Sequence, residues 1–159
     1  MTTKNTDLVA NFEASPQVAN SAAELAGVLR TAHGSVELAA GDSTDDDIVM
    51  LAPIPSNAAV PTLFIGSDTF GGSCTFNVGI YTSAGVVKDE DVFATSVADA
   101  AAMADVRYEA ADLNTGSQKL WELAGDTSDP GGYYYIAITF NATGGTAGTL
   151  NWNISYVVD

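Results

Sequence analysis

The side chains that most often carry out chemistry are scarce in this chain, which contains one histidine, His33, and one cysteine, Cys74. A zinc site needs several nitrogen or sulfur ligands, and a nucleophilic serine or cysteine needs a histidine beside it. His33 precedes a glycine, which favours a turn or surface position, and Cys74 opens a strand-like run, which favours a small buried residue. We therefore expect no enzyme, no metal site and no cofactor.

Acidic residues are abundant and gather at Asp45–Asp47 and Asp89–Asp91, with Asp126 and Asp129 further along the chain. Carboxylate oxygens are the ligands that calcium prefers, yet neither cluster has the EF-hand spacing with its glycine and closing glutamate. No pair of acids has a spacing that singles it out for glycoside hydrolysis. Solvated turns explain these clusters better than a cation site does.

The composition excludes several classes of partner. The 159 residues include 20 acidic and 5 basic side chains, and the formal net charge of −15 should repel nucleic acid and anionic membranes. Hydrophobic residues make up 47% of the chain and charged residues 16%, which predicts a folded domain with a largely uncharged polar surface. The first residues lack the charged and apolar regions of a signal peptide, so we expect a soluble protein made in a cytoplasm.

Short apolar runs separated by turn residues dominate the chain beyond residue 34 and predict strands. The expected strands cover residues 36–40, 48–55, 60–66, 75–82, 92–97, 118–124, 133–141 and 149–158. The alanine-rich stretch 98–107 predicts one short helix. Eight strands with so little helix favour an all-β antiparallel sandwich over a parallel sheet.

The last of these runs alternates between apolar and polar side chains along its whole length. The apolar set consists of Leu150, Trp152, Ile154, Tyr156 and Val158. In a half-buried strand this set faces the core, and the intervening polar side chains face outward. The same alternation turns Tyr134 inward in the preceding run and leaves Tyr133 and Tyr135 outward.

Residues 1–32 differ from the rest of the chain and are expected to form an N-terminal arm, with the domain proper at residues 33–159. Ser21 and Glu24 have the spacing of a capping box, which allows a short helix from about Ala22 to Leu29. The alternative, which we favour, is an extended arm that acquires order only against a neighbour.

The arm contains two basic and three acidic residues, so it is not a tail for nucleic acid, and its partner should be a protein. Its apolar side chains are the expected contacts with that partner. They are Leu8, Val9, Phe12, Val18, Leu25, Val28 and Leu29.

The middle of the chain resembles a family of small virion proteins of tailed phages, especially phages of aquatic bacteria. The resemblance rests on an aspartate before a strand that ends in Ile-Pro, a strand that ends in Val-Gly-Ile-Tyr, and an acidic segment before a phenylalanine. The matching residues are Asp47, Ile54, Pro55, Gly79, Ile80, Tyr81, Asp91 and Phe93. A glycine-tyrosine strand near Gly132 and a closing aromatic strand with Trp152 and Tyr156 extend the match over roughly residues 33–159.

The resemblance implies an eight-stranded antiparallel jelly-roll sandwich that acts as a capsid decoration, or cement, protein. Such a protein would be made in the host bacterium, would form a trimer on the outer capsid surface, and would bind the major capsid protein and bridge capsomers. The motifs set turns and strand ends, so no functional residue is carried over.

Jelly rolls also occur in head fibres, tails and baseplates, where the protein would bind host glycan instead. Trp121, Tyr133 and Tyr135 are the candidates for stacking on a sugar. A cellular jelly-roll enzyme is disfavoured, because the metal chemistry of such enzymes needs several histidines.

Overall fold

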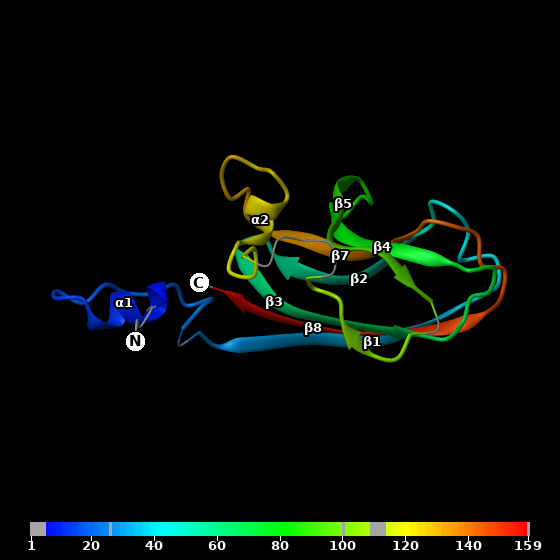
Figure 1. Cartoon of the computed structure of the whole chain (residues 1–159). Helices are drawn as coiled ribbons and strands as arrows, with labels where there is room; N and C mark the ends of the chain where they lie inside the picture. The colour runs from blue at the N-terminus through cyan, green and yellow to red at the C-terminus, as the bar shows by residue number, and fades with distance from the viewer. Residues whose placement is uncertain (1–5, 26, 100, 109–113, 159) are drawn as a thin grey trace.

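A computed structural model describes residues 6–25, 27–99, 101–108 and 114–158 and contains two antiparallel sheets that face each other (Figure 1). The strands are β1 Leu29–Leu38, β2 Ile48–Pro55, β3 Ala58–Ser67, β4 Thr75–Tyr81, β5 Val87–Ala98, β6 Ala104–Asp105, β7 Tyr133–Phe140 and β8 Gly148–Val158. The helices are α1 Asp7–Glu13 and α2 Leu120–Leu123. No helix among the described residues has the length and apolar content needed to cross a membrane.

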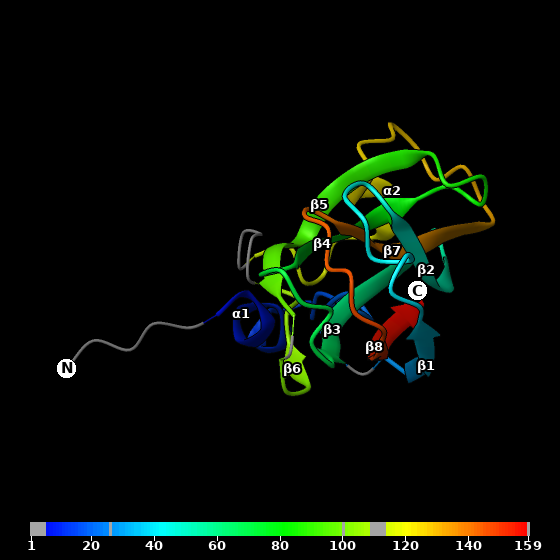
Figure 2. The same cartoon turned by 90° about the vertical axis from the view of Figure 1, so that its right-hand side faces the viewer.

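The strand order is that of a jelly roll. Sheet A has the order β1-β8-β3-β6, and sheet B has the order β2-β7-β4-β5. The pairs nest within one another, because β1 pairs with β8, β2 with β7, β3 with β6 and β4 with β5. A long hairpin rolled into two layers produces this nesting (Figure 2). The expected all-β jelly-roll sandwich is thus confirmed.

The alternation along β8 positions its side chains as the sequence predicts. Leu150 and Ile154 are fully buried, whereas Asn153 is exposed. Trp152 is half-buried against the core, and its ring lies over Gly34 of the paired strand β1. A Cβ atom on Gly34 would lie 2.7 Å from the ring carbon Cζ2 of Trp152, so only glycine fits beneath this ring.

Aromatic rings fill the core between the sheets. Phe140 of β7 makes edge-to-face contacts with Phe70 and Phe76, at centroid distances of 5.5 and 6.1 Å. Tyr134, Ile136 and Phe140 all point inward, as the alternation predicts.

The outer face of β7 is also partly covered. Thr139 is buried and shares a hydrogen bond with the hydroxyl of Tyr81. Gly79 allows the backbone of β5 to approach β4 closely here, because a Cβ atom at this position would collide with the carbonyl oxygens of Asp89 and Glu90. This close approach explains the glycine in the Val-Gly-Ile-Tyr run.

Two expected elements have the wrong type. The expected strand 118–124 contains the helix α2, in which the Glu122 carboxylate accepts a 2.7 Å hydrogen bond from the backbone N–H of Lys119. This cap closes a helical turn and buries Leu120, and a short apolar run does not distinguish a helix from a strand.

The helix expected over residues 98–107 is also wrong. β5 continues to Ala98, and Ala104 and Asp105 form β6 on the free edge of β3, although residue 100 lies outside the described part of the chain. The Asp105 carboxylate accepts hydrogen bonds from the backbone N–H groups of Leu63 and Arg107. Pairing with a distant strand therefore outweighs the helix propensity of alanine.

The N-terminal segment contains one helix that the sequence did not predict, α1. In the range 22–29, where a helix was allowed, residue 26 lies outside the described part of the chain and the described residues form a turn and the start of β1. The capping box at Ser21 forms only a turn, in which the N–H groups of Glu24 and Leu25 donate to the Ser21 carbonyl. β1 then begins at Leu29, so residues 29–32 belong to sheet A. The arm as the structure has it, residues 6–28, extends beyond one end of the sandwich (Figure 1).

Candidate interaction surfaces

The arm presents most of its apolar side chains to solvent. Phe12 is 64% exposed and Val28 74% exposed, and α1 has no buried residue. Of the seven expected contact residues, Leu8 is half-buried and the others are exposed. Exposed apolar side chains on a segment that projects from a domain favour contact with another protein.

Asparagine side chains hold the arm in shape. The Asn11 amide donates to Asn20 Oδ1 at 2.8 Å, and the Asn20 amide donates to the carbonyl of Leu8 at 3.2 Å. These bonds fold the segment after α1 back against the helix, and Phe12, Val18 and Leu25 line a shallow hollow there. The arm is therefore locally ordered around an apolar surface.

Close packing joins the arm to the sandwich at Gly27. A Cβ atom on Gly27 would lie 2.6 Å from Cγ1 of Val157, which belongs to β8 and is 6% exposed. The sequence offered no signal for this contact, because the two residues lie at opposite ends of the chain.

The three candidate glycan-binding aromatics differ in exposure. Tyr133 is 63% exposed, whereas Trp121 is half-buried against the core and Tyr135 is half-buried in β7. Within the described residues, none of these rings stacks on another of the three. Of the three side chains, Tyr133 is the most exposed.

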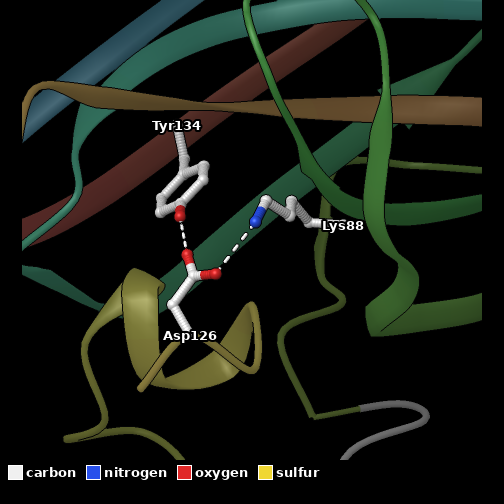
Figure 3. A network of polar contacts seen from close by, with 3 residues as sticks. All are labelled: Lys88, Asp126 and Tyr134. Carbon is white, nitrogen blue, oxygen red and sulfur yellow. Dashed lines mark hydrogen bonds and ion pairs between the residues drawn. The ribbon is translucent and has the colours of Figure 1, made fainter. Parts of the chain in front are cut away.

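A polar network joins α2 and the following loop to sheet B (Figure 3). Asp126 accepts a hydrogen bond from the hydroxyl of Tyr134 on β7, and its Oδ1 lies 2.9 Å from Nζ of Lys88 on β5. The bond from Tyr134 and the nearby Lys88 ammonium lower the pKa of Asp126. Burial and the Asp126 carboxylate raise the pKa of Tyr134 to about 12.

This network has a structural task, because it ties segments of the chain that are far apart in sequence to one carboxylate. From the sequence, Asp126 was considered only as a possible calcium ligand. The one available signal was Lys88, a lone cation next to the acidic segment 89–91.

The other acidic residues mostly stabilise turns. Asp47 accepts hydrogen bonds from the N–H and the hydroxyl of Thr44, which lower its pKa. Asp129 accepts from the Ser56 hydroxyl at 2.6 Å and from the Gly131 N–H at 2.9 Å, and its pKa is lowered as well. Among the residues that the structure describes, no group of three or more histidine, cysteine, aspartate or glutamate side chains is placed to hold a metal ion.

His33 and Cys74 lie where the sequence predicts. His33 is exposed on β1, and Cys74 is buried, with its sulfur 3.1 Å from the carbonyl of Ala142. Burial raises the pKa of the Cys74 thiol and so favours its protonated form. The two side chains lie on different elements and share no contact in the described structure.

Arg107 is a buried cation that the sequence analysis missed. Its Nε donates to the carbonyl of Val60 at 2.8 Å, one terminal nitrogen donates to Thr115, and the guanidinium lies 4.9 Å from the ring of Phe93. Burial lowers its pKa. Its bonds tie the segment after β6 to β3, which makes Arg107 part of the structural framework.

The fold resembles that of a solved phage structure. A chain in the cyanophage Pam1 capsid asymmetric unit matches this chain with a TM-score of 0.51 and 20% sequence identity, over 84% of this chain and 86% of that chain. At this identity the likeness concerns the fold. No family model matches the sequence, and no curated protein matches it.

Proposed function

We propose that this protein is a structural component of a tailed-phage virion, where it decorates the outside of the head. The observation that carries the proposal is the fold shared with a chain of a phage capsid over 84% of the sequence. The resemblance of the strand and turn motifs to those of small virion proteins supports it independently. The proposal includes no catalytic role and no cofactor.

A decoration protein acts by contact, and the geometry provides two parts for that task. The jelly roll is a two-sheet body with a shared core, and the arm extends from one of its ends with apolar side chains exposed. In the proposed function the arm contacts the major capsid protein, the sandwich covers a neighbouring capsomer, and the shell is stabilised by the bridge. Apolar contacts suit this role, because a chain with a net charge of −15 gains little from electrostatic attraction to another acidic surface.

We further propose that the protein attaches as a trimer. Three-fold positions between capsomers offer a site of matching symmetry, and a cyclic trimer presents three arms to the shell at once. Three weak arm contacts then act together, which strengthens attachment without a large interface for each arm.

Co-sedimentation with empty shells of the major capsid protein from the same phage tests the proposal. The full chain should pellet with the shells, and Phe12→Ser should weaken its binding, because Phe12 is the most exposed large apolar side chain on α1. Tyr133→Ser is the matched control, since Tyr133 is equally exposed but lies on the sandwich. A protein that stays in the supernatant with shells, or that binds a glycan array through Tyr133, would overturn the proposal.

A further inference from the structure

The distribution of charge singles out one face of the sandwich. Of the 20 acidic residues in the chain, the strands of sheet A carry two, Glu37 and Asp105, along with one basic residue, Arg30. Most of the remaining acids lie in the arm, in the loops and on β5. The outer face of sheet A is therefore nearly uncharged on a molecule whose net charge is −15.

Uncharged side chains occupy this face in three cross-strand rows. The rows are Thr31–Ser155–Thr62, His33–Asn153–Phe64 and Ser35–Asn151, and we call these residues the neutral face. The third row ends at Gly66, which is buried beneath the backbone of Met103. The side chains point away from the core, because the intervening Leu150 and Ile154 of β8 are fully buried. The side chains of Ser35, Asn153 and Ser155 make no hydrogen bond to any other residue that the structure describes. Their donors and acceptors are therefore available to a partner.

The neutral face ends at an unprotected sheet edge. Among the residues that the structure describes, β1 pairs with β8 alone, in an unbroken register from Leu29 to Leu38, and lies at the edge of sheet A (Figure 2). No other described strand pairs with the backbone groups on its other side. The other edges are protected in the ways that proteins use against strand addition. β2 carries Pro53, Pro55 and a bulge, β5 has shifts in register, and β6 has 2 residues.

We propose that the neutral face, together with the free edge of β1, is the surface on which a second copy of this chain docks. The inference adds a contact surface to the proposed oligomer and does not depend on attachment to a capsid.

The charge distribution favours a second copy of this chain as the partner that binds the neutral face. Two copies that met through their acidic loops would bring like charges together, whereas contact through the neutral face avoids this cost. A cationic partner would be drawn to the acidic loops rather than to a face without charge. Hydroxyl and amide groups both donate and accept hydrogen bonds, so the polar groups and free backbone groups of a neighbouring copy can satisfy them.

Symmetry and the neighbouring apolar side chains agree with this occupant. Residues near the axis of a cyclic oligomer lie close to their own counterparts, which disfavours charged side chains there. Leu29, which lies beside the rows at the start of β1, is 58% exposed, and Phe64 of the second row is 37% exposed, so both would lose contact with water in the assembly. These features fit the proposed trimer.

Sedimentation equilibrium of the full chain tests the inference through the substitutions Asn153→Glu and Ser35→Glu. Both positions are exposed and outside the core, so the fold should survive, and circular dichroism checks this. We expect the wild type to associate, and we expect each variant to associate at least about tenfold more weakly, because each copy then brings a charge into the contact.

Two controls separate the contact from general charge effects. Thr95→Glu places the same charge at an exposed strand position of β5, in sheet B, and should leave association unchanged. Asn153→Gln keeps the amide and should also associate like the wild type. Added salt should strengthen association of the wild type, because it screens the repulsion between acidic copies.

A wild type that stays monomeric at every concentration, or glutamate variants that associate as well as the wild type, would overturn the inference. No shell is present in this experiment. Failure here is therefore distinguishable from failure of the proposed function, which shows as a wild type that does not pellet with shells.

Discussion

Trp152 and Asn153 are neighbours on β8 that face opposite sides of sheet A, and their environments predict different costs on truncation. Trp152→Ala should lower the free energy of unfolding by about 3 kcal/mol, because the ring packs on the core and covers Gly34. Asn153→Ala should cost less than about 0.5 kcal/mol, because this side chain is exposed. Urea unfolding of dilute protein measures both, and similar losses at the two sites would contradict the alternation.

Tyr134 should be among the last tyrosines to ionise. Its pKa is raised to about 12 from an ordinary value of about 10, because its hydroxyl is buried and donates to Asp126. A raised pKa favours the protonated folded state. This contribution to stability is complete below the ordinary pKa and is lost as the pH rises toward 12.

Ultraviolet absorbance of the phenolate, followed during alkaline titration, checks this prediction. Burial also raises the pKa of Tyr81, so two tyrosines should titrate late. Tyr134→Phe should remove one of them, and a variant that keeps the whole late phase would contradict the structure.

At the scale of elements, β6 depends on one carboxylate. The Asp105 carboxylate accepts hydrogen bonds from the backbone N–H groups of Leu63 and Arg107. Asp105→Ala leaves these two donors without their acceptor. We expect a loss of about 1 to 3 kcal/mol in the free energy of unfolding. Hydrogen exchange should also become faster at the Leu63 amide.

Asp91→Ala serves as the control for this variant, since Asp91 is exposed and accepts a long hydrogen bond, 3.4 Å, from the Thr95 hydroxyl. It should change the stability little. An Asp105→Ala protein with unchanged exchange at Leu63 would show that strand pairing alone holds β6.

At the scale of the whole molecule, we expect the sandwich to fold without the arm and the arm to be needed for binding to capsid shells. Deletion of residues 1–28 removes the arm and leaves β1 complete, so the truncated protein should keep the circular dichroism of a sheet protein and a cooperative melt. Its binding to capsid shells should be strongly reduced, because the exposed apolar side chains of the arm are gone.

The deletion also removes the contact between Gly27 and Val157, so its effect on stability must be measured separately from its effect on binding. A small loss of stability fits removal of this contact. An unfolded product would show that the arm belongs to the core, and undiminished binding to shells would assign attachment to the sandwich.

Local pattern was sufficient to predict most strands. Every expected strand except 118–124 overlaps an observed one, and the inward set of β8 is as predicted. Alternation and turn signals involve only a few neighbouring residues, so each strand can be predicted from its own stretch of sequence. The all-β class followed from these strands, whereas the jelly roll was implied by resemblance.

Contacts between distant segments decided the rest. The formation of β6, the ion pair of Lys88 with Asp126 and the burial of Arg107 depend on pairs of residues far apart in the chain. The neutral face likewise exists only because β1, β8 and β3 lie side by side. The sequence by itself determined which side of each strand is apolar, because that is a property of neighbouring residues. Which strands meet, and therefore which uncharged side chains gather on one face, was decided only by tertiary structure, because pairing brings together residues that no local pattern relates.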